Sequence, residues 1–179
     1  MNRLKNRLKN NKGFTLAELL ITVLILLMVS SVVAGGIPVA ANALGKMVDA
    51  AHAETLLATT YTALRDELST AVPSRTITVS SNGKSIRYTD SDGVESKIEV
   101  KNDGKNDGIY ITKSGSERLL ISEIAATENL SATFKSVQCN DGIITITDLK
   151  VKNKKIGNDV NKLDSAVIRI VGYEAGKAA

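Results

Sequence analysis

A long apolar run near the start of the chain places the strongest limit on what the protein can fold into. Residues 14–33 read FTLAELLITVLILLMVSSVV, and Glu18 is their only charged member. A helix needs about twenty apolar residues to cross a hydrocarbon core about 30 Å thick. The run therefore predicts a membrane-spanning helix.

The thirteen residues before this run carry the basic character of the chain. They hold five cationic residues and no acid, whereas the whole chain of 179 residues has a net charge of +4. The five are Arg3, Lys5, Arg7, Lys9 and Lys12. Basic residues before a span predict a cytoplasmic N-terminus. The pI of about 9.1 therefore reflects targeting, and nucleic acid is not a favoured partner, although Lys152, Lys154 and Lys155 could contact phosphates.

Two simpler interpretations of the run stay open at this point. A secretory signal could be cut near Ala34-Gly35-Gly36, and a plain signal anchor would not be cut at all. Neither accounts for Gly13 directly before the run or for the carboxylate of Glu18 within it.

The carboxylate of Glu18 has a free-energy cost within a membrane segment, so a partner for its charge is expected. A carboxylate near the bilayer centre costs on the order of 3 kcal/mol. Cleavage between Gly13 and Phe14 would create an amine four residues before Glu18, about 6 Å along a helix. Glu18 could then pair with its own N-terminus or with that of a neighbouring subunit.

The segment Lys12-Gly13-Phe14-Thr15-Leu16-Ala17-Glu18-Leu19-Leu20 resembles the processing signature of type IV pilins and of the pseudopilins of type II secretion and competence systems. The resemblance covers residues 12–35. It implies cleavage after Gly13 by a membrane-bound prepilin peptidase, N-methylation of Phe14 by the same enzyme, and an assembly role for Glu18. It also implies partners: other pilin or pseudopilin subunits, an inner-membrane assembly platform and membrane lipid.

Helix breakers follow the apolar run. Gly costs about 1 kcal/mol and Pro about 3 kcal/mol in a helix interior, and Pro38 removes a backbone bond to the carbonyl of Ala34. Gly35, Gly36 and Pro38 therefore predict a kink or a locally melted turn, with the end of the spanning helix as the alternative.

Residues 39–71 resume a helical pattern. Leu57, Tyr61, Leu64 and Leu68 recur at helical spacing and predict one apolar stripe. Pro73 predicts the end of the helix. Because a helix of this length exceeds any bilayer, its second half is expected outside the membrane, with the stripe against a sheet.

The remainder of the chain alternates short β-branched segments with turn dipeptides such as Asn82-Gly83 and Asp141-Gly142. A short helix is expected at 122–130 and a polar, basic loop at 150–162. The expected strands are Thr76–Ser80, Lys84–Thr89, Ser96–Val100, Ile109–Thr112, Arg118–Ile121, Ile143–Leu149 and Ala166–Gly172. The predicted fold class is α+β, a pilin-like arrangement of one long N-terminal helix packed on a C-terminal antiparallel β-sheet.

The predicted organisation follows from these segments. Residues 1–13 form a leader, 14–35 a transmembrane and filament-core helix, and 36–72 its periplasmic or extracellular half. Residues 73–174 form a β-rich head and 175–179 a tail.

The sequence offers few groups for catalysis or ligand binding. His52 and Cys139 are the only residues of their kinds and lie far apart in sequence, so no enzyme and no cofactor is expected. Cys139 has no partner for an intrachain disulfide and is expected to be a half-buried core residue, with a disulfide between chains as the alternative. Asp103 and Asp107 are weak calcium candidates, because Asn-Asp-Gly favours tight turns.

The expected function is therefore structural: a subunit of a type IV pilus (fimbrium) or pseudopilus. The helix end Leu64–Leu68 and the β-rich head resemble those of minor pilins or J-type pseudopilins, and the missing disulfide departs from many major pilins. A single-pass location in the cell membrane is expected first, and a cell-surface or periplasmic filament afterwards. A signal-anchored surface binding domain is the alternative, and motility, adhesion, secretion and DNA uptake all stay open as purposes.

Overall fold

The computed structural model describes residues 14–72, 77–102, 107–122 and 129–173. The chain divides into two compact units, Met1–Lys46 and Met47–Ala179. From here on we call Leu16–Lys46 the stem and the whole second unit, which includes the second half of the long helix, the head. Helix α2, Leu16–Ser69, runs through both, so the predicted helix is confirmed over both segments.

Helix α2 is continuous through Gly35, Gly36 and Pro38. The expected melted turn and the alternative of a helix end are therefore wrong. Pro38 already has a helical φ, and it removes only its own backbone donor, while the bonds of neighbouring turns persist. A kink at this point stays a prediction.

The end of α2 forms backbone hydrogen bonds with two segments of the head that lie far apart in the sequence. The amide of Val72 donates to the carbonyl of Thr89 at 2.9 Å, and the amide of Val171 donates to the carbonyl of Ser69 at 3.2 Å. Val171, just after β9, thus satisfies a carbonyl that the helix end leaves unpaired, and Thr89 of β2 binds the chain just beyond the helix. Pro73 lies outside the described residues.

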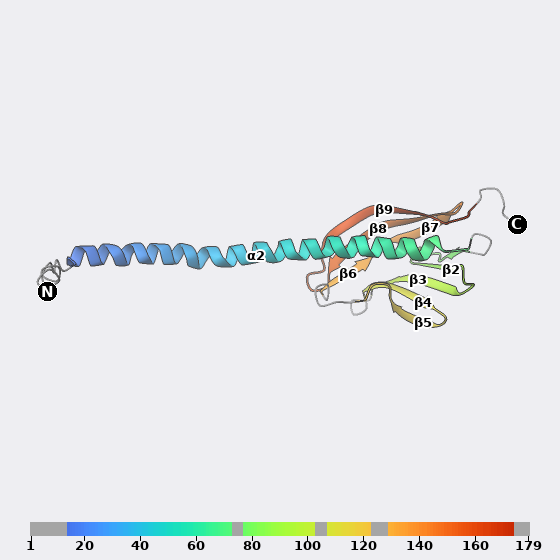
Figure 1. Ribbon diagram of the computed structural model, residues 1–179, viewed down its shortest axis with the longest axis horizontal. Coiled ribbons are helices and arrows are strands. Elements are labelled where there is room, and N and C mark those ends of the chain that lie inside the picture. The colour runs from blue at the N-terminus through green and yellow to red at the C-terminus, as the bar shows by residue number, and fades with distance from the viewer. Residues whose placement is uncertain (1–13, 73–76, 103–106, 123–128, 174–179) are drawn as a thin grey trace, which may run out of the picture. The chain divides into compact units, whose positions relative to one another are not determined.

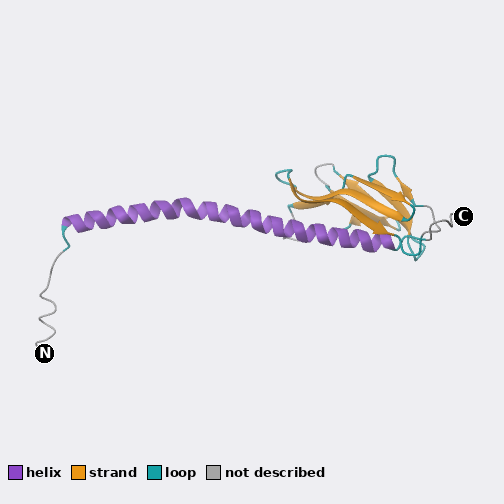
Figure 2. Ribbon diagram, turned by 90° about the horizontal axis from the view of Figure 1, so that it is seen from above, coloured by secondary structure: helices purple, strands orange, loops and turns teal. Residues whose placement is uncertain are grey.

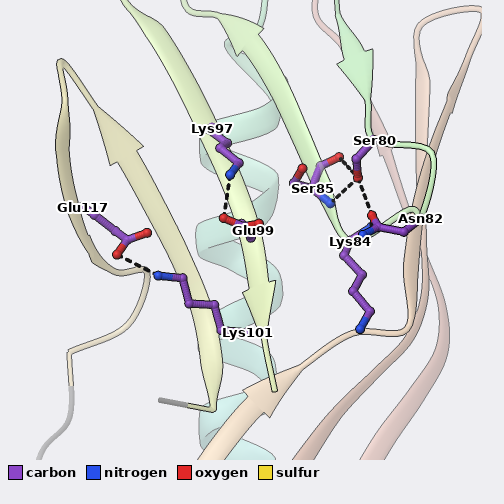
Figure 3. Close-up of polar contacts among 8 residues, drawn as sticks. All are labelled: Ser80, Asn82, Lys84, Ser85, Lys97, Glu99, Lys101 and Glu117. Carbon is purple, nitrogen blue, oxygen red and sulfur yellow. Dashed lines mark hydrogen bonds and ion pairs between the residues drawn. The ribbon is translucent and has the colours of Figure 1, made fainter. Parts of the chain in front are cut away.

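The first sheet of the head has five antiparallel strands in the order β1-β2-β3-β4-β5. They are β1 Thr78–Val79, β2 Ser85–Thr89, β3 Glu95–Lys101, β4 Gly108–Lys113 and β5 Ser116–Leu119. All five expected strands of this region are present, although β1 has only two residues. Ser80 and Asn82 hold the turn before β2, where the Ser80 hydroxyl donates to Asn82 Oδ1 at 2.7 Å (Figure 3).

The second sheet is built around one long strand. Strands β6 and β7 pair with successive parts of β8, and β9 also pairs with β8, each in antiparallel sense. The strands are β6 Leu130–Thr133, β7 Ser136–Asn140, β8 Ile143–Asn153 and β9 Asp159–Arg169. The head therefore holds two antiparallel sheets, and β6 and β7 are additional to the strands that the sequence predicted.

The expected loop at 150–162 is wrong, because most of it is β8, a turn and β9. Lys150 Nζ lies 2.9 Å from Asp159 Oδ2 and 3.4 Å from Asp148 Oδ2. Asn153 Oδ1 accepts hydrogen bonds from the backbone amides of Lys155 and Ile156 in the turn. These contacts allow a charged segment to pair as a hairpin. In the expected helix at 122–130, residues 123–128 lie outside the described residues, and Leu130 begins β6.

The core of the head lies between the second half of α2 and the two sheets, which lie along that part of the helix in both views (Figures 1 and 2). Leu64 and Leu68 of the predicted stripe are buried, whereas Leu57 and Tyr61 are partly buried beside it. Leu56 and Thr60 occupy the centre of the buried face instead. Thr60 is tolerated there because its hydroxyl donates to the carbonyl of Leu56 at 2.6 Å.

Candidate processing and assembly segment

The first turn of α2 is closed by the side chains of Thr15 and Glu18. The amide and hydroxyl of Thr15 donate to Glu18 Oε2 at 2.9 and 3.0 Å, and the amide of Glu18 donates to Thr15 Oγ1 at 3.2 Å. This reciprocal pattern is a capping box, which satisfies amides that a helix start leaves free. Glu18 therefore has a local structural role besides any role between subunits.

The capping box leaves part of the Glu18 carboxylate available. Both bonds from Thr15 end on Oε2, and among the described residues no hydrogen bond or ion pair reaches Oε1. The residue is exposed. Since a carboxylate can accept about four hydrogen bonds, Glu18 can hold the helix start and accept a second donor at once.

Phe14 lies directly before this cap and is 83% exposed. Gly13, on the other side of the expected cleavage site, lies outside the described residues. Thr15 is the first residue after Phe14, so a cut between Gly13 and Phe14 would leave the capping box intact. A new amine at Phe14 would then stand beside a helix start that is already formed.

The stem presents its apolar side chains outward. Every described residue from Phe14 to Ala51 is exposed, and the exposed large side chains extend from Leu16 to Val48. Apolar surface of this extent needs lipid or protein to cover it. Helix α2 is long and apolar enough to cross a membrane by length and composition.

The other candidate residues lie elsewhere. His52 is half-buried on α2, and Cys139 is half-buried on β7 at the margin of the core. Burial raises the pKa of the Cys139 thiol, which opposes formation of the reactive thiolate. Within the described parts of the chain, no three His, Cys, Asp or Glu side chains gather as metal ligands. Asp107 is half-buried before β4, and Asp103 lies outside the described residues, so the calcium interpretation stays a prediction.

The capping role of Thr15 was available in the sequence but was not recognised there. Thr15-Leu16-Ala17-Glu18 has the spacing of a capping box directly before an apolar helix. The charge of Glu18 indicates a partner between subunits, whereas its local partner, Thr15, lies three residues earlier.

Comparison with known families identifies the same segment. Residues 8–34 match the family model of the prokaryotic N-terminal methylation motif. Neither the curated proteins nor the solved structures gave a match.

The matched motif and the long apolar helix before antiparallel sheets together support a place in the type IV pilin and pseudopilin family. The motif supports a pilin-like or pseudopilin protein of the kind that prepilin peptidase processes. The motif implies assembly with other pilin subunits, and the exposed helix indicates membrane anchoring.

Proposed function

We propose that the protein is a structural, non-enzymatic subunit of a type IV pilus or pseudopilus. Prepilin peptidase cleaves it after Gly13 on the cytoplasmic side and methylates the amine of Phe14. The subunit then waits in the membrane as a single-pass protein, and an inner-membrane assembly platform transfers it from lipid into a filament at the cell surface or in the periplasm.

One observation carries this proposal: a methylation motif lies at the start of a helix whose stem is exposed along its whole length. Lipid covers such a surface before assembly, and the stems of other subunits cover it afterwards. Assembly into a filament uses a cleaved N-terminus, which processing at the motif would provide, whereas anchoring in lipid does not need one.

Glu18 has two roles in this account. Its Oε2 holds the helix start through Thr15, and its negative charge pairs with the N-terminal amine of a neighbouring subunit. Because a carboxylate in lipid is costly, each added subunit would relieve a buried charge.

The alternative is a signal-anchored surface domain that binds a ligand without forming filaments. Such a protein would tolerate loss of the Glu18 charge, since an uncharged residue enters a bilayer more readily. The dependence of assembly on this charge therefore discriminates the two functions.

Glu18→Gln is the informative substitution, because glutamine preserves a capping box and removes the charge. We expect this variant to be processed and to reach the membrane, but to enter filaments at least several-fold less than the parent, as measured by immunoblotting of sheared filaments. Thr15→Ala is the matched control, since it weakens the cap and keeps the charge. Absence of the parent chain from sheared filaments would favour the surface-domain alternative, whereas normal incorporation of Glu18→Gln would show that assembly does not depend on the charge.

Labelling of isolated filaments with gold-conjugated antibodies tests the minor role. Sparse labelling would identify a minor subunit, whereas dense labelling along the shaft would identify a major one.

A further inference from the structure

The two sheets of the head end in unpaired strands. Strand β5 pairs only with β4 and strand β9 only with β8 among the described strands. Figure 1 shows β5 and β9 at opposite margins of the head. Each free edge offers backbone donors and acceptors that another strand can use.

The direction of the two edge strands is fixed by the contacts at the end of α2. The end of β2 meets the helix end through Thr89 and Val72, and the residues after β9 meet it through Val171 and Ser69. Strands β2 and β9 therefore both run toward the helix end. Three antiparallel pairings separate β2 from β5, so β5 runs the opposite way.

This opposition has a consequence for neighbouring subunits. In a filament whose stems lie parallel, as the proposed function requires, β5 of one copy would be antiparallel to β9 of the next. Antiparallel strands form the more stable ladder. The two edges lie on opposite margins, so the same contact can repeat from copy to copy without closing into a dimer.

The outward-facing backbone groups can be assigned on both edges. The amide of Leu120 donates to the carbonyl of Ile109 in β4, so by the alternation of an antiparallel ladder Glu117 and Leu119 direct their groups outward. The amide of Lys162 donates to its neighbour's side chain, Asn161 Oδ1, at 2.8 Å. It is therefore not used by β8 and faces the open edge.

The side chains of Glu117 and Lys162 lie on the outer face of their sheets. Glu117 is opposite Thr112, whereas its neighbour Arg118 is opposite Ile111, which is fully buried. Lys162 is opposite Lys150, whereas its neighbour Asn161 is opposite Val151, which is fully buried. If β5 of one copy and β9 of another formed one ladder, the opposite charges of Glu117 and Lys162 would therefore lie on the same face of the combined sheet.

We propose that strand β5 of one copy pairs with strand β9 of the next along the filament, with Glu117 opposite Lys162. The pairing rests on the proposed function. In this register Ser116 lies opposite Leu163 and Arg118 opposite Asn161, which keeps the core-side faces together. A shift of two residues would place Glu117 opposite Asp164, and like charges directly opposite each other destabilise a ladder.

Both charges have exposed partners that they can exchange. Glu117 Oε2 lies 2.8 Å from Lys101 Nζ (Figure 3), and Lys162 Nζ lies 2.8 Å from Asp164 Oδ1. Exposed ion pairs of this kind contribute little to stability. Pairing between copies would replace them with a contact that a second strand shields from water.

Disulfide trapping tests the register. In a Cys139→Ser background, which removes the native thiol, Glu117→Cys and Lys162→Cys are combined in one chain, and filaments in the producing cells are oxidised. Opposed residues of an antiparallel pair have Cα atoms about 5.5 Å apart, within disulfide range. We expect a ladder of dimers and higher oligomers, and none from either single cysteine or from Arg87→Cys with Lys162→Cys.

A charge exchange gives an independent readout. Glu117→Lys and Lys162→Glu should each lower filament incorporation several-fold, and the double variant should recover at least half of the parent level. Filaments without a ladder would overturn the pairing and leave the proposed function intact, whereas a parent chain that forms no filaments would overturn both. If the cysteine pair does not assemble, failure of the double charge exchange to restore incorporation overturns the pairing.

Discussion

The two halves of helix α2 are one continuous helix, yet they differ in what covers their side chains. Every residue of the stem is exposed, whereas Ala53, Leu56, Thr60, Leu64 and Leu68 of the second half are buried. The second half has its partners within the same chain, in two sheets. The first half has a more apolar surface and no such partner within the described residues.

This difference separates folding from assembly. Burial of apolar surface stabilises a fold at about 25 cal/mol per Å², and the head obtains that burial from its own residues. The stem can obtain it only from lipid or from other molecules. Substitutions in the head should therefore change the stability of one molecule, and matched substitutions in the stem should change association.

Leu64→Ala should give the largest effect on stability. Leu64 is fully buried between the helix and the sheets, and such truncations cost about 2–5 kcal/mol. We expect thermal unfolding of the head, followed by circular dichroism in detergent, to occur at a markedly lower temperature.

Leu24→Ala is the matched control, because Leu24 lies on the same helix and is 50% exposed. It should leave unfolding of the head unchanged. A comparable destabilisation by both substitutions would break the comparison, since it would mean that the stem also packs within its own chain.

Gly142→Ala should give the next largest effect. Gly142 has a φ of +70°, and an added Cβ would lie 2.1 Å from Cγ of Tyr173. We expect a loss of about 1–3 kcal/mol from backbone strain and displacement of the ring, measured by urea denaturation. Gly36→Ala in the stem, where an added Cβ meets nothing within 4 Å, should not destabilise the head; equal effects would contradict the distinction.

The stem was more predictable from sequence than the head. A long apolar run and a basic leader identify a spanning helix from local composition alone, and Thr15 to Glu18 specify where it begins. In the head, β2, β3 and β4 alternate and are flanked by turn dipeptides. Strand β6 was missed because it has only four residues, too few for the apolar–polar alternation of Leu130 to Thr133 to stand out in the sequence.

The remaining errors have the same physical origin. Lys150 and Lys152 read as loop residues until the hairpin brings Asp159 of β9 beside Lys150. Thr60 reads as a surface residue until its own helix satisfies its hydroxyl. In both cases a polar side chain is accommodated by a hydrogen bond or ion pair that its residue type alone does not reveal.

The smallest effect is expected from a polar contact between helix and sheet in the head. The Tyr88 hydroxyl lies 3.3 Å from Glu67 Oε2, and Glu67 also binds Lys113 at 2.7 Å. Burial, followed by the negative charge of Glu67, raises the pKa of Tyr88 above its ordinary value of 10.0. The folded head therefore retains a proton that the unfolded chain releases in alkali.

This shift makes the stability of the head depend on pH. The contribution is fully present below pH 10.0 and is lost as the pH rises above that ordinary pKa. Tyr88→Phe should cost about 1 kcal/mol at neutral pH and should flatten the alkaline decline in unfolding temperature. Parallel declines in the parent and the variant would show that another group causes the pH dependence.

The most direct test of the account is the mass of the intact mature protein. Cleavage after Gly13 predicts a chain that begins at Phe14 and carries one methyl group on its N-terminal amine, as determined by mass spectrometry of the membrane and filament fractions. A chain that retains Met1, or one that begins after Gly36, would contradict it.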